Sequence, residues 1–176
     1  MSNITYIIAP IILSAILSFS LAVTLNFIYQ KKLWSHDAKI VIWQLFFFSL
    51  IILSANIRLV RNNPLSVLFI LTATGILATT IASLGKKSFF PFAKPSPTNK
   101  LITSGPYKIV RHPFYFATLL FCMAFVITKP LLIVFLFALM YILDKKANIE
   151  EGHLQERYEQ YRQYQKSTKK LIPFLY

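Results

Sequence analysis

Long apolar runs separated by short basic connections constrain this chain more than any other feature of its sequence. Residues 4–29, 40–59 and 65–84 are each apolar over the roughly 20 residues that a helix needs to cross a hydrocarbon core about 30 Å thick. Hydrophobic residues make up 56% of the chain and charged residues only 14%, whereas a soluble domain carries about a quarter charged residues. The sequence therefore predicts a polytopic membrane protein built as one helical bundle.

Two shorter apolar runs follow, at residues 114–127 and 131–143, with Thr128, Lys129 and Pro130 between them. Both are too short for a comfortable upright span, so they predict a tilted or partly penetrating helical hairpin. The fold class expected is an all-α integral membrane bundle of about five transmembrane segments, the last two being this hairpin. Residues 1–84 would form three helices, the first not a removable signal peptide, and residues 85–176 the catalytic region.

The distribution of basic residues predicts the orientation. Connections 30–39 and 85–111 and the tail from residue 144 hold 16 of the 19 Lys and Arg residues. By the positive-inside rule, the N-terminus then lies outside, and loop 85–111 and the C-terminus are cytoplasmic. Because the basic residues lie between apolar runs, the net charge of +13 is a topology signal, and no nucleic-acid partner is expected.

The stretch LITSGPYKIVRHPFY, residues 101–115, is unusual beside hydrophobic spans because it combines a Gly-Pro turn with Tyr, Arg and His. Four prolines, at 91, 95, 97 and 106, deny the connection 85–111 a continuous helix. Pro113 suits the first turn of the next helix. Polar groups are costly near hydrocarbon unless they have partners, so this stretch is predicted to form part of a binding site.

The tail beyond the hairpin concentrates the acidic residues, with five of the six between Asp144 and Glu159. On one helix, a stripe of mixed side chains would lie within about 80° of arc; its members are Lys146, Glu150, Leu154, Arg157, Tyr161 and Tyr164. The stripe fits an amphipathic helix on the bilayer surface. It also fits a helix that closes over residues 101–115 to complete a pocket.

Other chemistries find little support in the sequence. The single cysteine, Cys122, lies inside an apolar run and is expected to pack in the core. His36 and His153 lack partners at metal-ligand spacing, so no metal site is expected.

Several motifs occur together in the second half of the chain: GPY at 105–107, RHP-x-Y at 111–115, EE-x-x-L at 150–154, spaced tyrosines and LIP at 171–173. This combination resembles the isoprenylcysteine carboxyl methyltransferase family of integral membrane methyltransferases, which is related to the phospholipid methyltransferases. The resemblance covers residues 85–176, and the first three helices match by hydropathy only. It implies a pocket for S-adenosylmethionine (SAM) built from the loop and the tail.

The resemblance also implies roles for individual residues. Contacts to the cofactor would come from Leu101, Ile102, Tyr107, His112, Pro113, Phe114, Tyr115 and Glu150, with Glu151 a further candidate. Lys146 occupies the position of a family arginine that faces the carboxylate of the substrate, so Lys146 and Glu150 are the catalytic candidates. Lysine keeps the charge of that arginine but loses its planar fork, which leaves the acceptor open among a prenyl-cysteine carboxylate, a lipid amine or another amphiphile.

The chemistry of SAM agrees with these residue types. Its sulfonium favours aromatic faces, its hydroxyl and ammonium donors favour a carboxylate, and its own carboxylate needs donors. Methyl transfer is a single displacement, for which the protein aligns and desolvates the reactants. The partners expected are a lipophilic or lipidated substrate and membrane lipid, with the oligomeric state open.

Structural roles that involve no cofactor stay open for the same residues. His112 would also serve as a helix-start residue, Arg111 as a headgroup anchor, and Tyr107 and Tyr115 as interfacial aromatic residues. Membrane sterol reductases have a stretch similar to RHP-x-Y, so an NADPH-dependent sterol or isoprenoid reductase is an alternative function. A non-catalytic membrane protein on the same scaffold is another.

Overall fold

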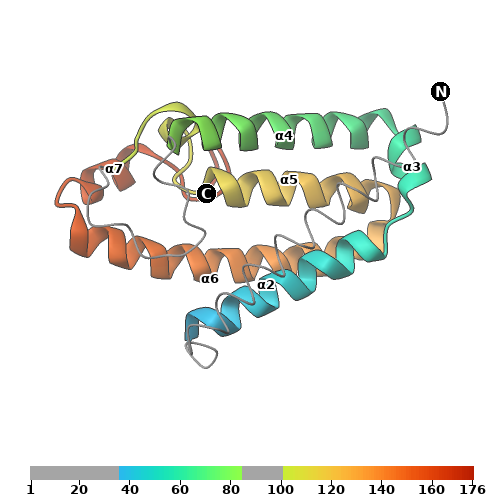
Figure 1. Cartoon of the computed structure of the whole chain (residues 1–176), viewed down its shortest axis with the longest axis horizontal. Coiled ribbons are helices and arrows are strands. Elements are labelled where there is room, and N and C mark those ends of the chain that lie inside the picture. The colour runs from blue at the N-terminus through green and yellow to red at the C-terminus, as the bar shows by residue number, and fades with distance from the viewer. Residues whose placement is uncertain (1–35, 85–100) are drawn as a thin grey trace. The chain divides into compact units, whose positions relative to one another are not determined.

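The computed structural model describes residues 36–84 and 101–176, so the predictions for the first helix and for residues 85–100 lie outside the described residues. The chain divides into two compact units, Met1–Leu45 and Phe46–Tyr176. The described elements are α2 (His36–Leu53), α3 (Ile57–Asn62), α4 (Pro64–Leu84), the 3-10 turn η1 (Gly105–Lys108), α5 (Pro113–Thr128), the 3-10 turn η2 (Pro130–Leu132), α6 (Ile133–Arg157) and α7 (Tyr161–Ser167). The all-α prediction is confirmed for these residues (Figure 1).

The second apolar run is not one helix, contrary to the prediction for residues 40–59. Helix α2 ends at Leu53, and the short helix α3 begins after Asn56. The Asn56 side chain accepts hydrogen bonds from the N–H groups of Arg58, at 3.1 Å, and Leu59, at 3.4 Å. An asparagine that caps a new helix in this way satisfies donors that a continuous helix would have bonded to its own carbonyls.

Helix α4 matches the third predicted span in its length and apolar composition. Pro64–Ser83 is the one helix among the described residues that is long and apolar enough to cross a membrane, and only 17% of its most apolar window is buried. An apolar helix with so much exposed surface requires apolar surroundings. The remaining spans stay a prediction, since α5 has 16 residues and the apolar part of α2 is shorter than a full crossing.

Small side chains allow α4 to pack closely against α5, which lies between α4 and α6 (Figure 1). Ser66, Ala73 and Thr80 are buried at intervals of seven residues along α4. The Ser66 hydroxyl donates a 2.8 Å hydrogen bond to the carbonyl of Ala124 on α5. Small residues and interhelical hydrogen bonds are typical of helix pairs in membranes, where no hydrophobic force drives association.

The predicted hairpin is confirmed, but its second arm is longer than expected. The chain breaks after Thr128, and η2 carries it into α6. Helix α6 then runs without interruption through Asp144 to Arg157, so the arm and the acidic segment of the tail are one helix. Tyr158 is extended, and α7 starts at Tyr161. The single stripe that would include Tyr161 and Tyr164 is therefore wrong, because the chain turns back and buries Tyr161 to 1% exposure.

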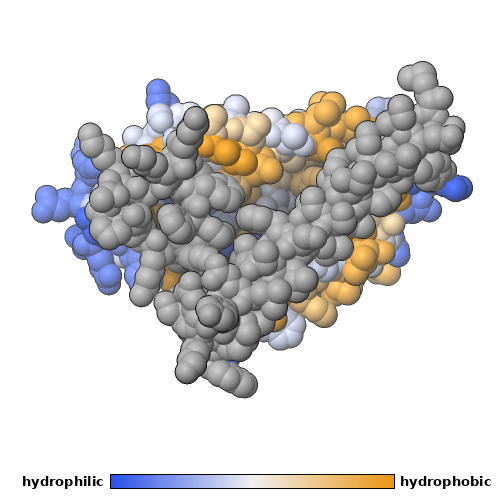
Figure 2. Space-filling view, in the orientation of Figure 1, coloured by the Kyte–Doolittle hydropathy of each residue, from blue (hydrophilic) through white to orange (hydrophobic). Residues whose placement is uncertain are grey.

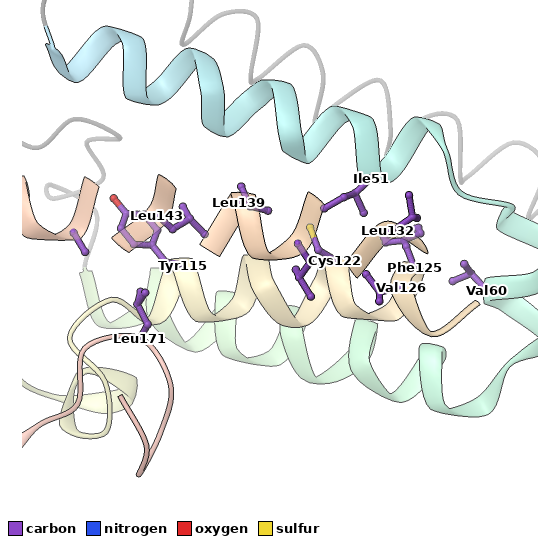
Figure 3. Packing of buried hydrophobic residues seen from close by; sticks show 12 residues of the cluster. Ile51, Val60, Tyr115, Cys122, Phe125, Val126, Leu132, Leu139, Leu143 and Leu171 are labelled. Atoms are coloured by element: carbon purple, nitrogen blue, oxygen red, sulfur yellow. The ribbon is translucent and has the colours of Figure 1, made fainter. Parts of the chain in front are cut away.

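The core of the second unit follows the hairpin (Figure 3). Leu136, Leu139 and Leu143 of α6 pack with Cys122 and Phe125 of α5. Cys122 is fully buried, as the sequence predicted. Tyr115 and Leu171 extend this cluster toward the polar end of α6, so the core supports that end directly.

The second unit carries polar residues at its two ends. Hydrophilic residues gather around α7 and around α3, with hydrophobic surface between them (Figure 2). Near α3, the Lys129 ammonium donates to the Ser54 carbonyl at 3.3 Å, so the tip of the hairpin and the α2–α3 turn lie at one end. Residues 101–112 and the tail lie at the other end.

Candidate functional site

The loop before α5 and the C-terminal tail are joined through their backbones. Val110 and Lys169 form an isolated parallel bridge. The N–H of Arg111 donates to the carbonyl of Lys169 at 2.8 Å, and the N–H of His112 to that of Lys170 at 3.1 Å. Pro113 then opens α5 at a position where its missing N–H is not required. The RHP motif is thus held between the tail and the start of α5.

The turn that leads into this motif depends on Gly105. Its φ of +61° lies in the left-handed region that side chains other than glycine disfavour. A Cβ built at this position would lie 2.3 Å from the Ser83 hydroxyl oxygen at the end of α4. The Gly-Pro turn therefore sets the approach of residues 105–108 to α4.

Gly105→Ala is expected to destabilise the protein by more than about 1 kcal/mol, since the backbone conformation alone costs about 1–2 kcal/mol for a side chain with a Cβ. Thermal unfolding in detergent measures the effect. Gly152→Ala is the matched control, because nothing lies within 4 Å of a Cβ at this helical position, and alanine should stabilise it slightly. Adding Ser83→Ala should restore the part of the loss that comes from the contact with Ser83. Equal stability of the Gly105→Ala and Gly152→Ala proteins would contradict this account.

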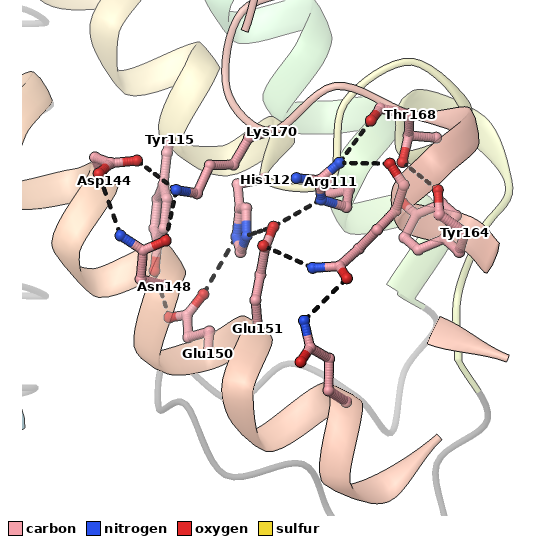
Figure 4. A network of polar contacts seen from close by, with 12 residues as sticks. Arg111, His112, Tyr115, Asp144, Asn148, Glu150, Glu151, Tyr164, Thr168 and Lys170 are labelled. Atoms are coloured by element: carbon pink, nitrogen blue, oxygen red, sulfur yellow. Dashed lines mark hydrogen bonds and ion pairs between the residues drawn. The ribbon is translucent and has the colours of Figure 1, made fainter. Parts of the chain in front are cut away.

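The imidazole of His112 lies between two consecutive carboxylates of α6 (Figure 4). Its Nδ1 is 3.3 Å from Glu150 Oε2, and its Nε2 is 3.2 Å from Glu151 Oε1. A neutral imidazole has one ring nitrogen without a proton, which would face a carboxylate oxygen with its lone pair. Both contacts are favourable only when both nitrogens donate, so this geometry selects the imidazolium.

The electrostatics of the three groups agree with that assignment. Burial lowers the pKa of His112, but hydrogen bonds to Glu150 and Glu151 outweigh burial and raise this pKa above its ordinary value. Burial raises the pKa of Glu151, yet hydrogen bonds from His112 and Arg111 reverse the effect and hold this pKa at about 2. The pKa of Glu150 is likewise lowered against burial, by His112 and then by the charge of Lys146.

These shifts predict how stability depends on pH. Glu151, with its depressed pKa, stabilises the fold above about pH 4.5, and this contribution is lost as the pH falls toward 2. His112, with its raised pKa, stabilises the fold fully below about pH 6.5, and the contribution is lost as the pH rises through its folded pKa. Melting temperatures in detergent should therefore be highest at about pH 4.5–6.5.

The alkaline decline in melting temperature should disappear in His112→Gln. It should persist in His153→Gln, because the side chain of His153 is 39% exposed and lies 3.9 Å from the exposed Glu156. An unchanged alkaline decline in His112→Gln would show that His112 is not its source.

Arg111 connects the site to α7 and the tail. Its Nε donates to Glu151 at 2.6 Å, and its Nη1 donates to the carbonyls of Gln165, at 3.1 Å, and Thr168, at 2.5 Å. The Gln165 amide also donates to Glu151 Oε2 at 2.9 Å. Glu151 thus accepts from three protein donors, which leaves it little capacity for a ligand.

Glu150 lies in different surroundings, among aromatic rings. It accepts a hydrogen bond from the Tyr115 hydroxyl. The Tyr115 ring stacks on that of His112 at 3° and 5.3 Å, and Lys146 Nζ lies 5.2 Å from the Tyr115 ring centre. Burial and then the charge of Glu150 raise the pKa of Tyr107 to about 12. The Tyr107 carbonyl accepts from the Tyr164 hydroxyl at 2.6 Å.

The structure brings most of the predicted site residues together. Tyr107, His112, Tyr115, Lys146, Glu150 and Glu151 form one cluster at the polar end of α6. Pro113 is buried at the start of α5, and Phe114 packs on the hydrophobic core. Leu101 and Ile102 are half-buried ahead of η1. Their predicted cofactor contacts stay predictions.

The sequence interpretation missed several polar partners. Lys170 counted only as a topology charge, yet its ammonium contacts Asp144 and Asn148 of α6 at 2.6 Å each. Arg111 was a possible anchor, and the RHP motif was the signal that could have identified it as part of the site. Within residues 36–84 and 101–176 there is no group of three His, Cys, Asp or Glu side chains placed to hold a metal.

A buried ion network lies at the polar end of an apolar helical hairpin, beside a helix that is long and apolar enough to cross a membrane. Residues 62–161 match the phospholipid methyltransferase family. The chain belongs to this family, which places it among the membrane methyltransferases and does not favour the reductase alternative. The match does not distinguish the isoprenylcysteine carboxyl methyltransferases within the broader group.

One curated relative is the cobalt-zinc-cadmium resistance protein CzcN of Cupriavidus metallidurans, 28% identical over 109 residues. The alignment covers 60% of this chain and 50% of the relative, so the chain spans about half the length of the curated relative it matches. No solved structure shows a significant match.

Proposed function

We propose that the protein transfers a methyl group from SAM to a lipophilic acceptor at the membrane surface, in the manner of the isoprenylcysteine carboxyl methyltransferases. The observation that carries the proposal is the state of Glu150. Its side chain is 19% exposed, and within residues 36–84 and 101–176 its hydrogen-bonding partners are Tyr115 and His112. A carboxylate has about four acceptor sites, so Glu150 retains capacity for the ammonium or hydroxyl donors of SAM.

The groups around Glu150 suit the rest of the cofactor. Tyr107 supplies an aromatic ring that attracts the sulfonium, whereas the Tyr115 ring already contacts His112 and Lys146. His112 and Arg111 hold the loop and α6 in place through Glu151, so the site is organised before the ligand binds. The protein then needs only to align the methyl group with the acceptor and exclude water.

The direct test is cofactor binding to the purified full-length protein in detergent. Calorimetric titration should show binding of SAM and no binding of NADPH. Incubation with methyl-labelled SAM and a membrane lipid extract should then move label into the organic phase. NADPH binding without SAM binding would restore the reductase alternative, and binding of neither would favour a non-catalytic protein.

Lys146 is proposed to face the acceptor, one helical turn from Glu150 on the same side of α6. Burial lowers the pKa of Lys146, and the negative charge of Glu150 opposes this shift. Lys146→Ala should lower kcat/KM for the acceptor by about 10- to 100-fold, the usual loss for one partner of a charged contact. The Kd for SAM should change less than threefold.

Lys145→Ala is the matched control, because the Lys145 ammonium lies over the exposed Tyr141 ring at 5.3 Å, away from this cluster. A Lys146→Ala protein with normal turnover would remove Lys146 from the acceptor site. A large loss of SAM affinity would instead place it on the cofactor.

A further inference from the structure

The C-terminal segment 169–176 forms a closed turn that is tied to α6 by polar contacts. The Lys170 ammonium contacts Asp144 and Asn148 at 2.6 Å each (Figure 4). The Tyr176 hydroxyl donates to Asp144 at 3.0 Å. The N–H groups of Leu171 and Ile172 donate to the main-chain oxygen of Tyr176 at 2.8 and 2.7 Å. The anchoring side of this turn is therefore polar and satisfied.

The tip of the same turn is apolar and exposed. Phe174 is 89% exposed and Leu175 is 75% exposed. Phe174 has a φ of 64°, a left-handed conformation that is uncommon for a bulky residue. The turn thus presents two large apolar side chains outward. The backbone of Phe174 has a conformation that is energetically unfavourable for a bulky residue.

The contacts of the turn with Asp144 indicate how deep its tip would lie relative to the bilayer. Asp144 is the first charged residue after the apolar part of α6, where the helix leaves hydrocarbon. Val134, Phe137 and Tyr141 are exposed on α6, and helical geometry places them within about 80° of Asp144. The turn is thus tied to α6 on the side that carries this exposed apolar stripe, at the level where the stripe ends.

Basic and aromatic residues surround this level. Lys145 lies over the Tyr141 ring at 5.3 Å, and Lys169 is exposed at the start of the turn. Lysines and tyrosines beside an apolar segment are typical of the membrane–water interface, where ammonium groups reach lipid phosphates. If the tip bound a soluble protein, the lysines and the tyrosine would have no reason to lie where the hydrophobic stripe ends.

We propose that Phe174 and Leu175 insert into the interfacial region of the bilayer beside α6. Insertion holds the tail at the membrane surface, and the tail holds Arg111 and His112 through its backbone bonds to the loop. The bilayer is then a structural partner of the segment that covers the site. This inference rests on the membrane placement of α4–α6 and stands independently of the methyl acceptor.

Spin-label accessibility in nanodiscs tests the proposal on the full chain. Labels are attached at Phe174→Cys and Leu175→Cys, while Cys122 remains because it is fully buried. Leu71→Cys on α4, 65% exposed, reports the bilayer, and Gln163→Cys on the exposed side of α7 reports water. Collisions with oxygen and with a water-soluble nickel chelate are compared at each position, and SAM binding is measured on the same samples.

At positions 174 and 175 the oxygen-to-nickel ratio should exceed that at 163 several-fold and fall below that at 71. A ratio equal to that at 163 would place the tip in water and overturn the proposal. Protection from both reagents would also overturn it, because protein would then cover the tip. Water access at 71 would reject the membrane placement itself. SAM binding lost with an inserted tip would count against the proposed function alone.

Discussion

Glu150→Ala is expected to weaken SAM binding by about 10- to 100-fold, because a hydrogen bond to a charged group contributes roughly 1.5–3 kcal/mol. Glu150 is the carboxylate of the pair that keeps both exposure and acceptor capacity, with a side chain 19% exposed against 9% for Glu151. Calorimetric titration of the variant in detergent, beside the wild type, measures the loss.

Two companion variants separate binding from folding. Glu156→Ala removes an acid of the same helix whose side chain is 82% exposed, and it should leave the affinity unchanged. Glu150→Gln keeps an acceptor for the Tyr115 hydroxyl but loses the charge, so its affinity should be intermediate. If Glu150→Ala keeps its melting temperature and binds SAM as well as the wild type, Glu150 has a structural role only.

Glu151→Ala should produce the largest loss of stability, about 3 kcal/mol or roughly 6–12 °C in melting temperature for a chain of this size. The side chains of Arg111 and Glu151 are 12% and 9% exposed, and their atoms are 2.6 Å apart. Removing the carboxylate leaves Arg111 with its backbone acceptors only and removes one of the two partners of His112. Thermal unfolding by circular dichroism measures the change.

A double-mutant cycle identifies the source of that loss. Glu151→Ala and Arg111→Ala combined should cost less than the sum of the single changes, because each single change leaves a buried charge without its partner. Glu156→Ala should stay within about 0.5 kcal/mol of the wild type, as expected for an exposed position. Additive effects of the two buried changes would mean that the pair does not act as a unit.

Local chemistry determined much of the helical layout, and this part was predictable from the sequence. Apolar length predicts the helix α4. Prolines predict the start of α5 at Pro113 and the break at Lys129, because a proline acts on the backbone within a few residues. The sequence also indicated that the GPY, RHP and EE motifs form one cluster, because their residue types suit a single ligand chemistry.

Contacts between distant parts of the chain decided the rest. Glu150 and Glu151 are neighbours, and no local rule says which of them pairs with Arg111; the position of Arg111, 40 residues from Glu151, decides it. Likewise α6 ends at Arg157 because the following residues fold back on the loop, and Lys170 pairs with Asp144 across 26 residues. Helical periodicity carries no information about such pairings, since they depend on how the hairpin, the loop and the tail pack together.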